Sequence, residues 1–369
     1  MSSTEPVSGA TANTYVPRRI DEYLKEVLQR NGSDLHFIAG DPPRIRMYGE
    51  LQPLRSEILS PQFVEETLRE IMPRAAQQRL EEKNGADFAY IIPGISRFRV
   101  NVMRHLYGLG CVCRAIPSKA LTLDQLNMPD AVRNLCKVNN GLILVTGKTG
   151  SGKSTTLAAM IDDINNRMKG HILTIEDPIE FVHRRKSCLI SQREVGVHTK
   201  GFAAALQSGL REDPDVVLVG ELRDYETISI AVTAAEMGIL VMGTLHTNGA
   251  AQTVDRMVNV FPSDKQSHVR TMLSTSLRGV VSQQLLQKAD KSGRVAALEI
   301  LVNTPAAANL IRQGKLDQLE NVMQAGGAHG MRTMDTAIQQ LLDSRQIAGK
   351  EAFKKAINKA KFEAVRDNG

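Results

Sequence analysis

The strongest constraint on the fold is the segment GKTGSGKS at residues 147–154. It matches the pattern G-x-x-x-x-G-K-[ST], and it stands between an apolar run and a stretch competent to form a helix. In such a strand–loop–helix setting, glycines let backbone N–H groups converge on phosphate oxygens, and the helix N-terminus adds a favourable dipole. The sequence therefore predicts a nucleoside triphosphate site, where Lys153 reaches the β- and γ-phosphates and the Ser154 hydroxyl binds Mg²⁺. The residues expected to contact the nucleotide are Gly147, Lys148, Thr149, Gly150, Ser151, Gly152, Lys153, Ser154 and Thr155.

Length and composition exclude several other classes of protein. The 369 residues suffice for two domains, and no apolar stretch approaches the roughly 18 residues of a membrane span. Residues 1–17 lack the apolar segment of a secretory signal, and we expect them to form a disordered extension. The four cysteines form no CxxC pair, which favours a reducing cytoplasm over a metal site. A net charge of +6 permits contact with anionic partners, but an aromatic content of 4% offers little base-stacking surface for nucleic acid.

The pattern of apolar residues, glycines and prolines divides the chain into five segments, the first of which is the extension at residues 1–17. Residues 18–117 predict a small, largely antiparallel α+β domain, with a helix at 20–28 and strands at 35–38, 44–47, 88–91, 97–103 and 110–115. Residues 118–140 predict a linker and a helix that starts near Leu123. Strands and helices then alternate over 141–303, which is typical of a parallel sheet. The expected strands are 142–146, 171–175, 216–219, 239–244 and 296–301, and the expected helices are 154–168, 202–211, 225–237, 250–259 and 267–284. Residues 304–369 are expected to be helical. Taken together, the segments predict an α/β fold with a P-loop core.

Glu221 is the candidate general base. It follows the apolar run 216–219, a strand that we expect to lie next to the P-loop strand, and its carboxylate should then point into the nucleotide crevice. There it could orient and deprotonate an attacking water. The competing interpretation is a carboxylate that caps the next helix. Because Gly220 stands where many NTPases carry a metal-binding Asp, the metal is expected to depend mainly on Ser154 and water.

Two further polar groups follow predicted strands. Glu176, Asp177 and Glu180 place three carboxylates within five residues, which is costly unless they meet Mg²⁺, arginine or water. A polar loop is the alternative explanation. Thr244 and His246 end another strand, and both could sense the γ-phosphate, although a lone histidine can also be structural.

Arginines recur on the strand candidates of the N-terminal domain, and they could serve the same chemistry. Arg97, Arg99, Arg104 and Arg114 alternate as a solvated sheet face would. Phosphoryl transfer, however, needs positive charge on its transition state. The alternative is therefore that these arginines enter the nucleotide site of the same or a neighbouring subunit.

Four segments together resemble the secretion-type P-loop ATPases, and most closely the type IV pilus retraction ATPases. GKTGSGKST is similar to the family's Walker A motif, TIEDPIEF to its acidic box, DPDVVLVGELRD to its Walker B motif and GTLHTN to its His box. Residues 32–36, 96–101 and 113–117 are similar to the family's small domain. The resemblance covers the chain from about residue 18 onward.

The resemblance implies a PAS-like N-terminal domain joined to a RecA-like ATPase core, assembled as a homo-hexameric ring that uses ATP and Mg²⁺. Arg99 and Arg114 match the family arginines that reach the γ-phosphate, Glu221 its catalytic glutamate and Glu180 its acidic-box glutamate. Such a motor powers pilus retraction and twitching motility by removing pilin subunits beneath an inner-membrane platform protein. It would be cytoplasmic, at the inner face of the inner membrane, with membrane contact only through its partner and no nucleic acid bound.

Departures from the family pattern keep alternatives open. Ile239 replaces the first histidine of the His box, and residues 306–313 read AAANLIRQ where retraction motors carry a motif resembling AIRNLIRE. An accessory pilus ATPase, working with a paralogous ATPase as partner, is therefore one alternative. An ATP-gated adaptor and a nucleic-acid translocase are the others. The additional N-terminal domain and CxxC region of the pilus-extension ATPases are not found.

Overall fold

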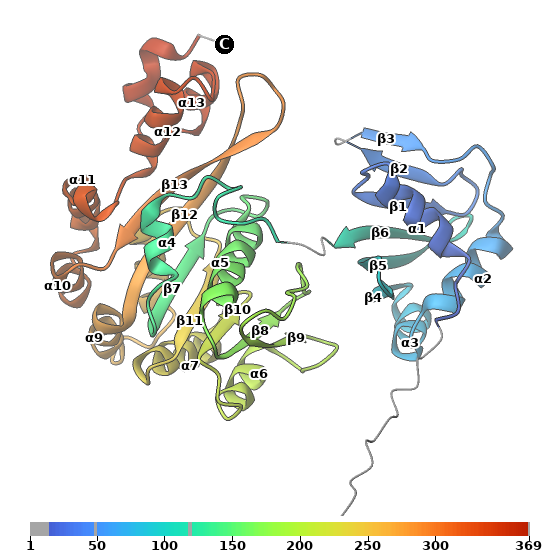
Figure 1. Cartoon of the computed structure of the whole chain (residues 1–369), viewed down its shortest axis with the longest axis horizontal. Coiled ribbons are helices and arrows are strands. Elements are labelled where there is room, and N and C mark those ends of the chain that lie inside the picture. Colours follow the sequence, from blue (N-terminus) through green and yellow to red (C-terminus); the bar gives the residue numbers. More distant parts are fainter. Residues whose placement is uncertain (1–14, 48–49, 117–119, 368–369) are drawn as a thin grey trace, which may run out of the picture. The chain divides into compact units, whose positions relative to one another are not determined.

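The computed structural model describes residues 15–47, 50–116 and 120–367. It divides into two compact units, residues 1–118 and 119–369 (Figure 1). Most of the expected N-terminal extension, and the start of the expected linker at 118–119, lie outside the described residues. None of the described helices is both long enough and apolar enough to cross a membrane.

The N-terminal unit contains a six-stranded sheet in the order β3-β2-β1-β6-β5-β4, in which every neighbouring pair is antiparallel. The expected helix and five expected strands are confirmed, whereas α2, α3 and β3 were not predicted. A signal for α2 was present, because Ser60 caps it and Pro61 occupies its first turn. The elements are α1 (Ile20–Gln29), β1 (Asp34–Ile38), β2 (Arg44–Met47), β3 (Glu50–Pro53), α2 (Pro61–Ile71), α3 (Arg74–Lys83), β4 (Gly85–Ile92), β5 (Ser96–His105) and β6 (Gly108–Ile116).

Burial alternates along the strands of this sheet, as expected when one face is packed and the other is open. In β5, Phe98, Val100 and Val102 are buried in the core that the three helices cover. Arg99 lies between them on the outward face, directly opposite Arg114 of β6. The period-two pattern thus places the two arginines side by side on the exposed face.

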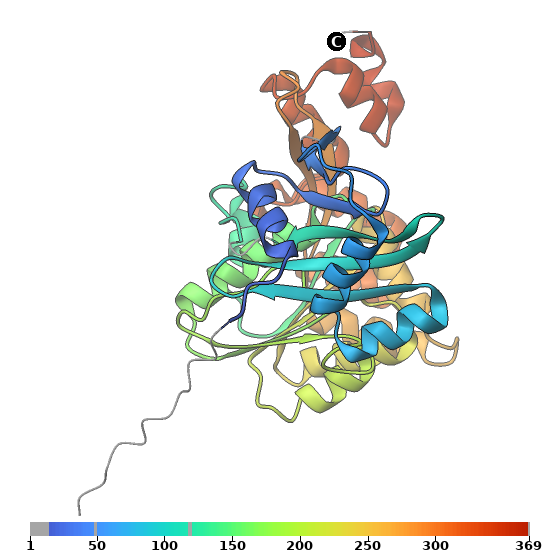
Figure 2. The ribbon, with the colours of Figure 1, turned by 90° about the vertical axis from the view of Figure 1, so that its right-hand side faces the viewer.

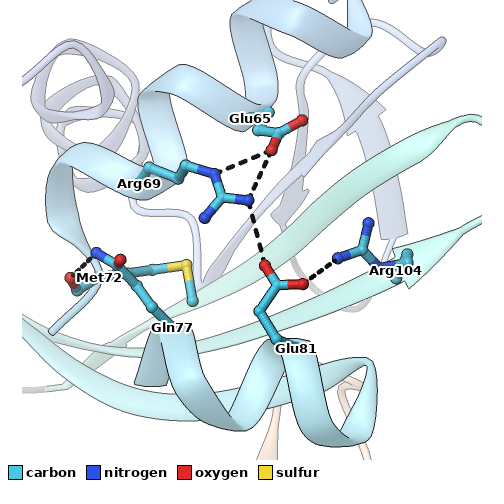
Figure 3. A network of polar contacts seen from close by, with 6 residues as sticks. All are labelled: Glu65, Arg69, Met72, Gln77, Glu81 and Arg104. Carbon is cyan, nitrogen blue, oxygen red and sulfur yellow. Dashed lines mark hydrogen bonds and ion pairs between the residues drawn. The ribbon is translucent and has the colours of Figure 1, made fainter. Parts of the chain in front are cut away.

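A polar network ties the outer helices to the sheet. Arg69 of α2 donates to Glu65 in its own helix and, at 3.2 Å, to Glu81 of α3 (Figure 3). The second carboxylate oxygen of Glu81 accepts from Arg104 of β5, also at 3.2 Å. Each pair is roughly half exposed and contributes at most about 1 kcal/mol. Arg104 is therefore engaged within its own unit.

The second unit contains a seven-stranded sheet in the order β13-β12-β7-β11-β10-β8-β9. All neighbouring strands are parallel except β13, which runs antiparallel to β12. The strands are β7 (Gly141–Thr146), β8 (His171–Glu176), β9 (Leu189–Glu194), β10 (Val216–Val219), β11 (Leu240–Leu245), β12 (Leu277–Gln287) and β13 (Arg294–Val302). This is the expected α/β architecture, in which the carboxyl ends of the parallel strands share one edge.

Helices cover both faces of this sheet (Figure 1). Alternate residues of a single strand belong to different cores: Leu144 of β7 packs with α7 and α8, whereas Ile143 and Val145 pack with α4 and α5. Burial on both faces explains why these strands read as continuous apolar runs. The helices of the core are α4 (Asp130–Leu135), α5 (Lys153–Arg167), α6 (Phe202–Gly209), α7 (Tyr225–Glu236), α8 (Ala250–Asn259) and α9 (Gln266–Ser276).

The helix predicted over 267–284 is wrong in its second half. Helix α9 ends at Ser276, and residues 277–287 form β12 between β7 and β13. Gly279 permits this close packing, because a Cβ there would lie 2.9 Å from the backbone oxygen of Leu301. Pairing with the distant strand β7 on one side and with the following strand β13 on the other outweighs the local helical pattern.

The helix expected near Leu123 begins later, at Asp130. Leu123 is buried, but it lies in a turn rather than a helix. Pro129 disfavours helical geometry in the residue before it and supplies an extended N-cap for α4. The proline therefore determines where this helix starts.

The C-terminal region consists of helices, as expected, and its last helices pack beside the far end of the β12–β13 hairpin (Figures 1 and 2). The buried carboxylate of Glu299 on β13 accepts from the backbone N–H of Ala250, at the start of α8, and from that of Met334, at the start of α12. Burial raises the pKa of Glu299, although these two donors counteract the effect. The C-terminal elements are α10 (Pro305–Gln313), η1 (Leu316–Gln318), α11 (Leu319–Ala325), η2 (Gly326–His329), α12 (Met334–Asp343), α13 (Gly349–Lys355) and η3 (Lys359–Val365).

Candidate active site

The loop between β7 and α5 has the geometry of a phosphate cradle. Gly147, Gly150 and Gly152 have φ angles of 139°, 78° and 91°, which side chains with a Cβ rarely adopt. A Cβ at Gly147 would lie 2.3 Å from the backbone oxygen of Gln283, so no larger residue fits there. The loop ends at the N-terminus of α5, where backbone N–H groups and the helix dipole favour an anion. Lys148 and Thr149 are exposed on the loop, while Thr155 lies half-buried in the first turn of α5.

Lys153 lies inside the curve of this loop. Its Nζ donates to the backbone oxygens of Gly147 at 2.8 Å and Lys148 at 3.2 Å. Burial lowers the pKa of Lys153, and the carboxylates of Glu221 and Glu180 partly offset that effect. The ammonium group of Lys153 is thus close enough to the carboxylates of Glu221 and Glu180 to interact with both electrostatically.

The residues of the loop fit a nucleotide whose phosphates also bind a metal ion. Ser154 lies half-buried in the first turn of α5, next to Lys153. Ser151 carries a buried hydroxyl with no hydrogen-bond partner among the described residues, so its O–H can still be donated. No group of three or more His, Cys, Asp or Glu side chains in the described part of the chain could hold a metal unaided. The Ser154 hydroxyl could hold a divalent cation together with phosphate oxygens and water, which are the oxygen ligands that Mg²⁺ prefers.

The strand order corrects one expectation about Glu221. Strand β10, which precedes it, is not next to the P-loop strand β7, because β11 lies between them. Glu221 still belongs to the shared carboxyl edge, since β7, β11 and β10 are parallel and in register. The inserted strand brings His246, which follows β11, between Glu221 and the loop. Sequence order alone cannot reveal this arrangement.

Glu221, His246 and Thr149 form a chain of polar contacts from strand end to loop. The Nε2 atom of His246 lies 3.4 Å from Oε1 of Glu221, and its Nδ1 lies 3.5 Å from Oγ1 of Thr149. Arg223 contacts the other oxygen of Glu221 at 2.6 Å. Burial raises the pKa of Glu221, but the hydrogen bond from Arg223 and the nearby charges outweigh it and leave the pKa below its ordinary value. The carboxylate is thus held ionised, as a general base requires.

The capping interpretation of Glu221 does not apply to α7. That helix is capped by Asp224, whose Oδ1 accepts from the backbone N–H of Thr227 at 2.8 Å. The Glu221 side chain, which is 19% exposed, is instead directed to Arg223 and His246. Arg223 is a site residue that sequence reasoning missed, although it stands only two positions after Glu221.

Gly220 and Thr244 hold the ends of β10 and β11 together. The Thr244 hydroxyl donates to the backbone oxygen of Gly220, and Thr244 is almost fully buried. A Cβ at Gly220 would lie 3.1 Å from the backbone oxygen of Ile175, so a larger residue there would require a small shift of the neighbouring strand end. The Thr244 hydroxyl thus ties the end of β11 to the residue that precedes Glu221.

The acidic cluster divides into a buried carboxylate and two exposed ones. Glu176 is buried, and it accepts from the Thr174 hydroxyl at 2.7 Å and from the backbone N–H of Glu180 at 3.3 Å. Burial raises the pKa of Glu176, although these bonds partly counteract it. Asp177 and Glu180 are exposed, and Glu180 acts electrostatically on Lys153. Glu176 shapes the loop that carries the other two carboxylates.

The N-terminal arginines differ in how firmly their own unit holds them. Arg114 is 67% exposed, and its Nε donates at 2.7 Å to Asp34, whose side chain is 3% exposed. Arg99 lies 3.9 Å from Asp87, and both of these side chains are about half exposed. Arg99 and Arg114 both present guanidinium groups to solvent on one sheet face, whereas Arg97 is half-buried.

A family comparison gives this geometry its context. The model of the type II/IV secretion system protein family matches residues 10–367. The chain belongs to this family. Its sequence is 49% identical over 337 residues to the type IV pilus retraction ATPase PilT of Pseudomonas aeruginosa. This alignment covers 91% of this chain and 98% of that protein. The chain is 39% identical over 333 residues to the type IV pilus ATPase PilU of the same organism, covering 90% of this chain and 87% of PilU.

A solved structure extends the similarity to three dimensions. The crystal structure of the pilus retraction motor PilT with bound ADP superimposes with a TM-score of 0.88 at 42% sequence identity. The match covers 95% of this chain and all of that chain. The two units described above therefore have the secretion-ATPase fold.

Proposed function

We propose that this chain is an ATPase that assembles as a homo-hexamer and powers type IV pilus retraction. The observation that carries the proposal is the 49% identity to a pilus retraction ATPase over nearly the full length of both chains. The loop, the lysine and the glutamate–histidine pair at one sheet edge support the chemistry. We assign the N-terminal unit as PAS-like and the 141–303 core as RecA-like, with residues 304–369 as its helical appendage.

In this proposal ATP binds with its phosphates on the loop and with Mg²⁺ on the Ser154 hydroxyl. Lys153 exchanges its contacts with the loop carbonyls for phosphate oxygens, and Glu221 accepts the proton of the attacking water. His246 connects Glu221 to the loop through Thr149, which would make the position of the base sensitive to the state of the loop. The nucleotide supplies the anhydride bond that is cleaved.

Arg99 and Arg114 are proposed to complete the site from a neighbouring subunit. Their exposed guanidinium groups are cross-strand neighbours, and because like charges placed opposite each other are unfavourable, a further anion beside them, in addition to Asp34 and Asp87, would be stabilising. A γ-phosphate in the ring would provide that anion. Glu180 is proposed to act as an acidic-box carboxylate near the same phosphates.

The proposed cellular setting is the cytoplasmic face of the inner membrane, beneath a platform protein of the pilus base. We infer that the membrane is reached through this partner and that nucleic acid is not a ligand. One departure favours a second candidate function: residues 306–313 lack the retraction-motor motif, and the chain is also 39% identical to PilU. An accessory ATPase would work only beside a paralogous pilus ATPase.

Steady-state ATP hydrolysis by the purified chain, with mass measured in the same samples, tests the ATPase proposal. Lys153→Ala should lose nucleotide binding, whereas Glu221→Gln should bind ATP and hydrolyse it about 10²–10⁴-fold more slowly. Glu226→Gln, the same change on the exposed first turn of α7, should match the wild type. A wild-type protein that binds ATP without turnover would instead support an ATP-gated adaptor.

Pilus retraction in a host deprived of its own retraction ATPases separates the motor from the accessory function. A self-sufficient motor should restore retraction when this chain is expressed alone. Restoration only when a second pilus ATPase is also expressed would assign the accessory function.

A further inference from the structure

Gln283 of β12 contacts both ends of the phosphate-binding loop. The last residue of β12 paired with β7 is Ser282, opposite Thr146, so Gln283 stands beside the first residue of the loop. Its backbone oxygen lies 2.3 Å from the position of a Cβ on Gly147, and its Nε2 lies 2.7 Å from that of a Cβ on Gly152. Gln283 is 3% exposed. The residue thus fills the space behind the loop.

The amide oxygen of Gln283 also holds the helix that follows the loop. Its Oε1 accepts a 2.7 Å hydrogen bond from the hydroxyl of Thr156, and both residues are buried. Thr156 lies in the first turn of α5, three positions after Lys153. A buried hydrogen bond of this kind fixes the helix start, because either partner left alone would be desolvated without compensation.

Beyond Gln283, the same strand continues into the C-terminal helices. Leu286 is buried in the core that they form, and the backbone N–H of Gln287 donates to Glu351 of α13 at 3.1 Å. The end of β12 that lies beyond Gln283 is therefore packed against the C-terminal helices. The Gln283 amide is thus bonded to Thr156, while its own strand is anchored further along at Gln287.

We propose that Gln283 is a positioning residue for hydrolysis: its amide fixes the start of α5 and the Gly152 corner of the loop, so that Lys153 and Ser154 meet the phosphates correctly. The inference rests on the proposed ATPase function. The inference predicts a loss of kcat, because displacing a phosphate-binding group by about 1 Å can lower the rate up to 10²-fold while the nucleotide still binds.

Two substitutions separate the contacts of Gln283. Gln283→Met keeps an unbranched side chain of similar size but removes the acceptor for Thr156, and kcat should fall about 10–100-fold. Gln283→Glu keeps that acceptor but replaces the amide nitrogen beside Gly152 with a charged oxygen. It should retain more of kcat than Gln283→Met at saturating ATP, and its KM should rise more, because the new charge repels phosphate.

The test measures kcat, KM and thermal unfolding for both variants, for Thr156→Val and for the double variant Thr156→Val/Gln283→Met. Gln284→Met is the matched control, since Gln284 points to the other face of β12 and is only half-buried. Positioning predicts that Gln284→Met behaves as wild type and that the double variant loses no more kcat than Gln283→Met alone.

Three results would overturn the inference. One is a kcat of Gln283→Met within twofold of the Gln284→Met value. Another is a pair of losses that multiply in the double variant, which would show that Gln283 and Thr156 act independently. The third is a wild-type protein without turnover, which overturns the ATPase proposal and this inference together, whereas the first two leave the ATPase proposal intact.

Discussion

Substituting Arg114 should damage the fold as well as the proposed chemistry, whereas substituting Arg99 should affect only the chemistry. Arg114→Ala leaves the buried carboxylate of Asp34 without its 2.7 Å partner. A hydrogen bond to a charged group contributes about 1.5–3 kcal/mol, and the high exposure of Arg114 lowers that figure. The Ser33 hydroxyl still donates to Asp34, and Arg46 still lies opposite it on β2. The expected loss is therefore about 1–2 kcal/mol in the opening free energy of β1 and β6.

Arg99→Ala is the matched control for this effect. Arg99 approaches Asp87 only to 3.9 Å, and both side chains are about half exposed, so losing the contact should cost less than about 0.5 kcal/mol. Removing Arg99 also relieves its like-charge apposition with Arg114, which offsets part of that cost. If both arginines serve the site, both variants lose turnover, but only Arg114→Ala should lose stability.

Hydrogen exchange measured by mass spectrometry on the full chain can localise the difference. A loss of 1–2 kcal/mol corresponds to roughly 5–30-fold faster exchange, expected in peptides covering Asp34–Ile38 and Gly108–Ile116. The chain has no tryptophan, which makes this readout more informative than fluorescence. Exchange in Arg114→Ala that matches the wild type would refute the reasoning, and so would equal acceleration in Arg99→Ala.

Three further substitutions test the geometry around Glu221. Arg223→Gln removes the hydrogen bond that helps hold the pKa of Glu221 below its ordinary value. Because a base works only when deprotonated, the acid limb of the kcat/KM profile should move to higher pH, and an unmoved limb would exclude Glu221 as the titrating group. Gly220→Ala places a Cβ 3.1 Å from the backbone oxygen of Ile175, which should destabilise the protein by about 1–3 kcal/mol. Calorimetry measures this loss. Unchanged unfolding would mean that the strand ends shift to accommodate the methyl group without cost. Thr244→Val removes the hydroxyl that donates to the Gly220 carbonyl, so the free energy of unfolding should fall by about 1–2 kcal/mol. In steady-state kinetics, kcat should fall by a larger factor than KM changes. An altered KM with normal kcat would instead favour direct nucleotide contact by Thr244.

The sequence predicts those parts of the site that are written locally. The glycine and lysine spacing of the P-loop determines both its conformation and its ligand, and each polar group that follows an apolar run ends at the same edge of a parallel sheet. Glu221 and His246 were found in this way, and the structure brings them to 3.4 Å from each other. Local patterns sufficed because each residue lies within a few positions of its own strand end.

What the sequence could not predict depends on pairing between distant segments. The position of β11 between β7 and β10 follows from packing of the whole sheet, and no short pattern encodes it. Strand β12 was read as helix, so Gln283 went unnoticed, although the β-branched pair Val280–Val281 favoured a strand. Arg223 was overlooked for a different reason: an exposed arginine near a turn gives no signal until its carboxylate partner is placed.

The carboxylate of Glu299 accepts from the first turns of two helices, α8 just after the His-box segment and α12 in the C-terminal region. Ala250 binds one oxygen of this buried carboxylate and Met334 binds the other, so neither helix end can shift without stretching its bond to Glu299. A spectroscopic label on α12 would therefore report motion of the segment that follows His246 without touching the nucleotide site. The C-terminal helices are thus joined, through a single side chain, to the segment that carries His246.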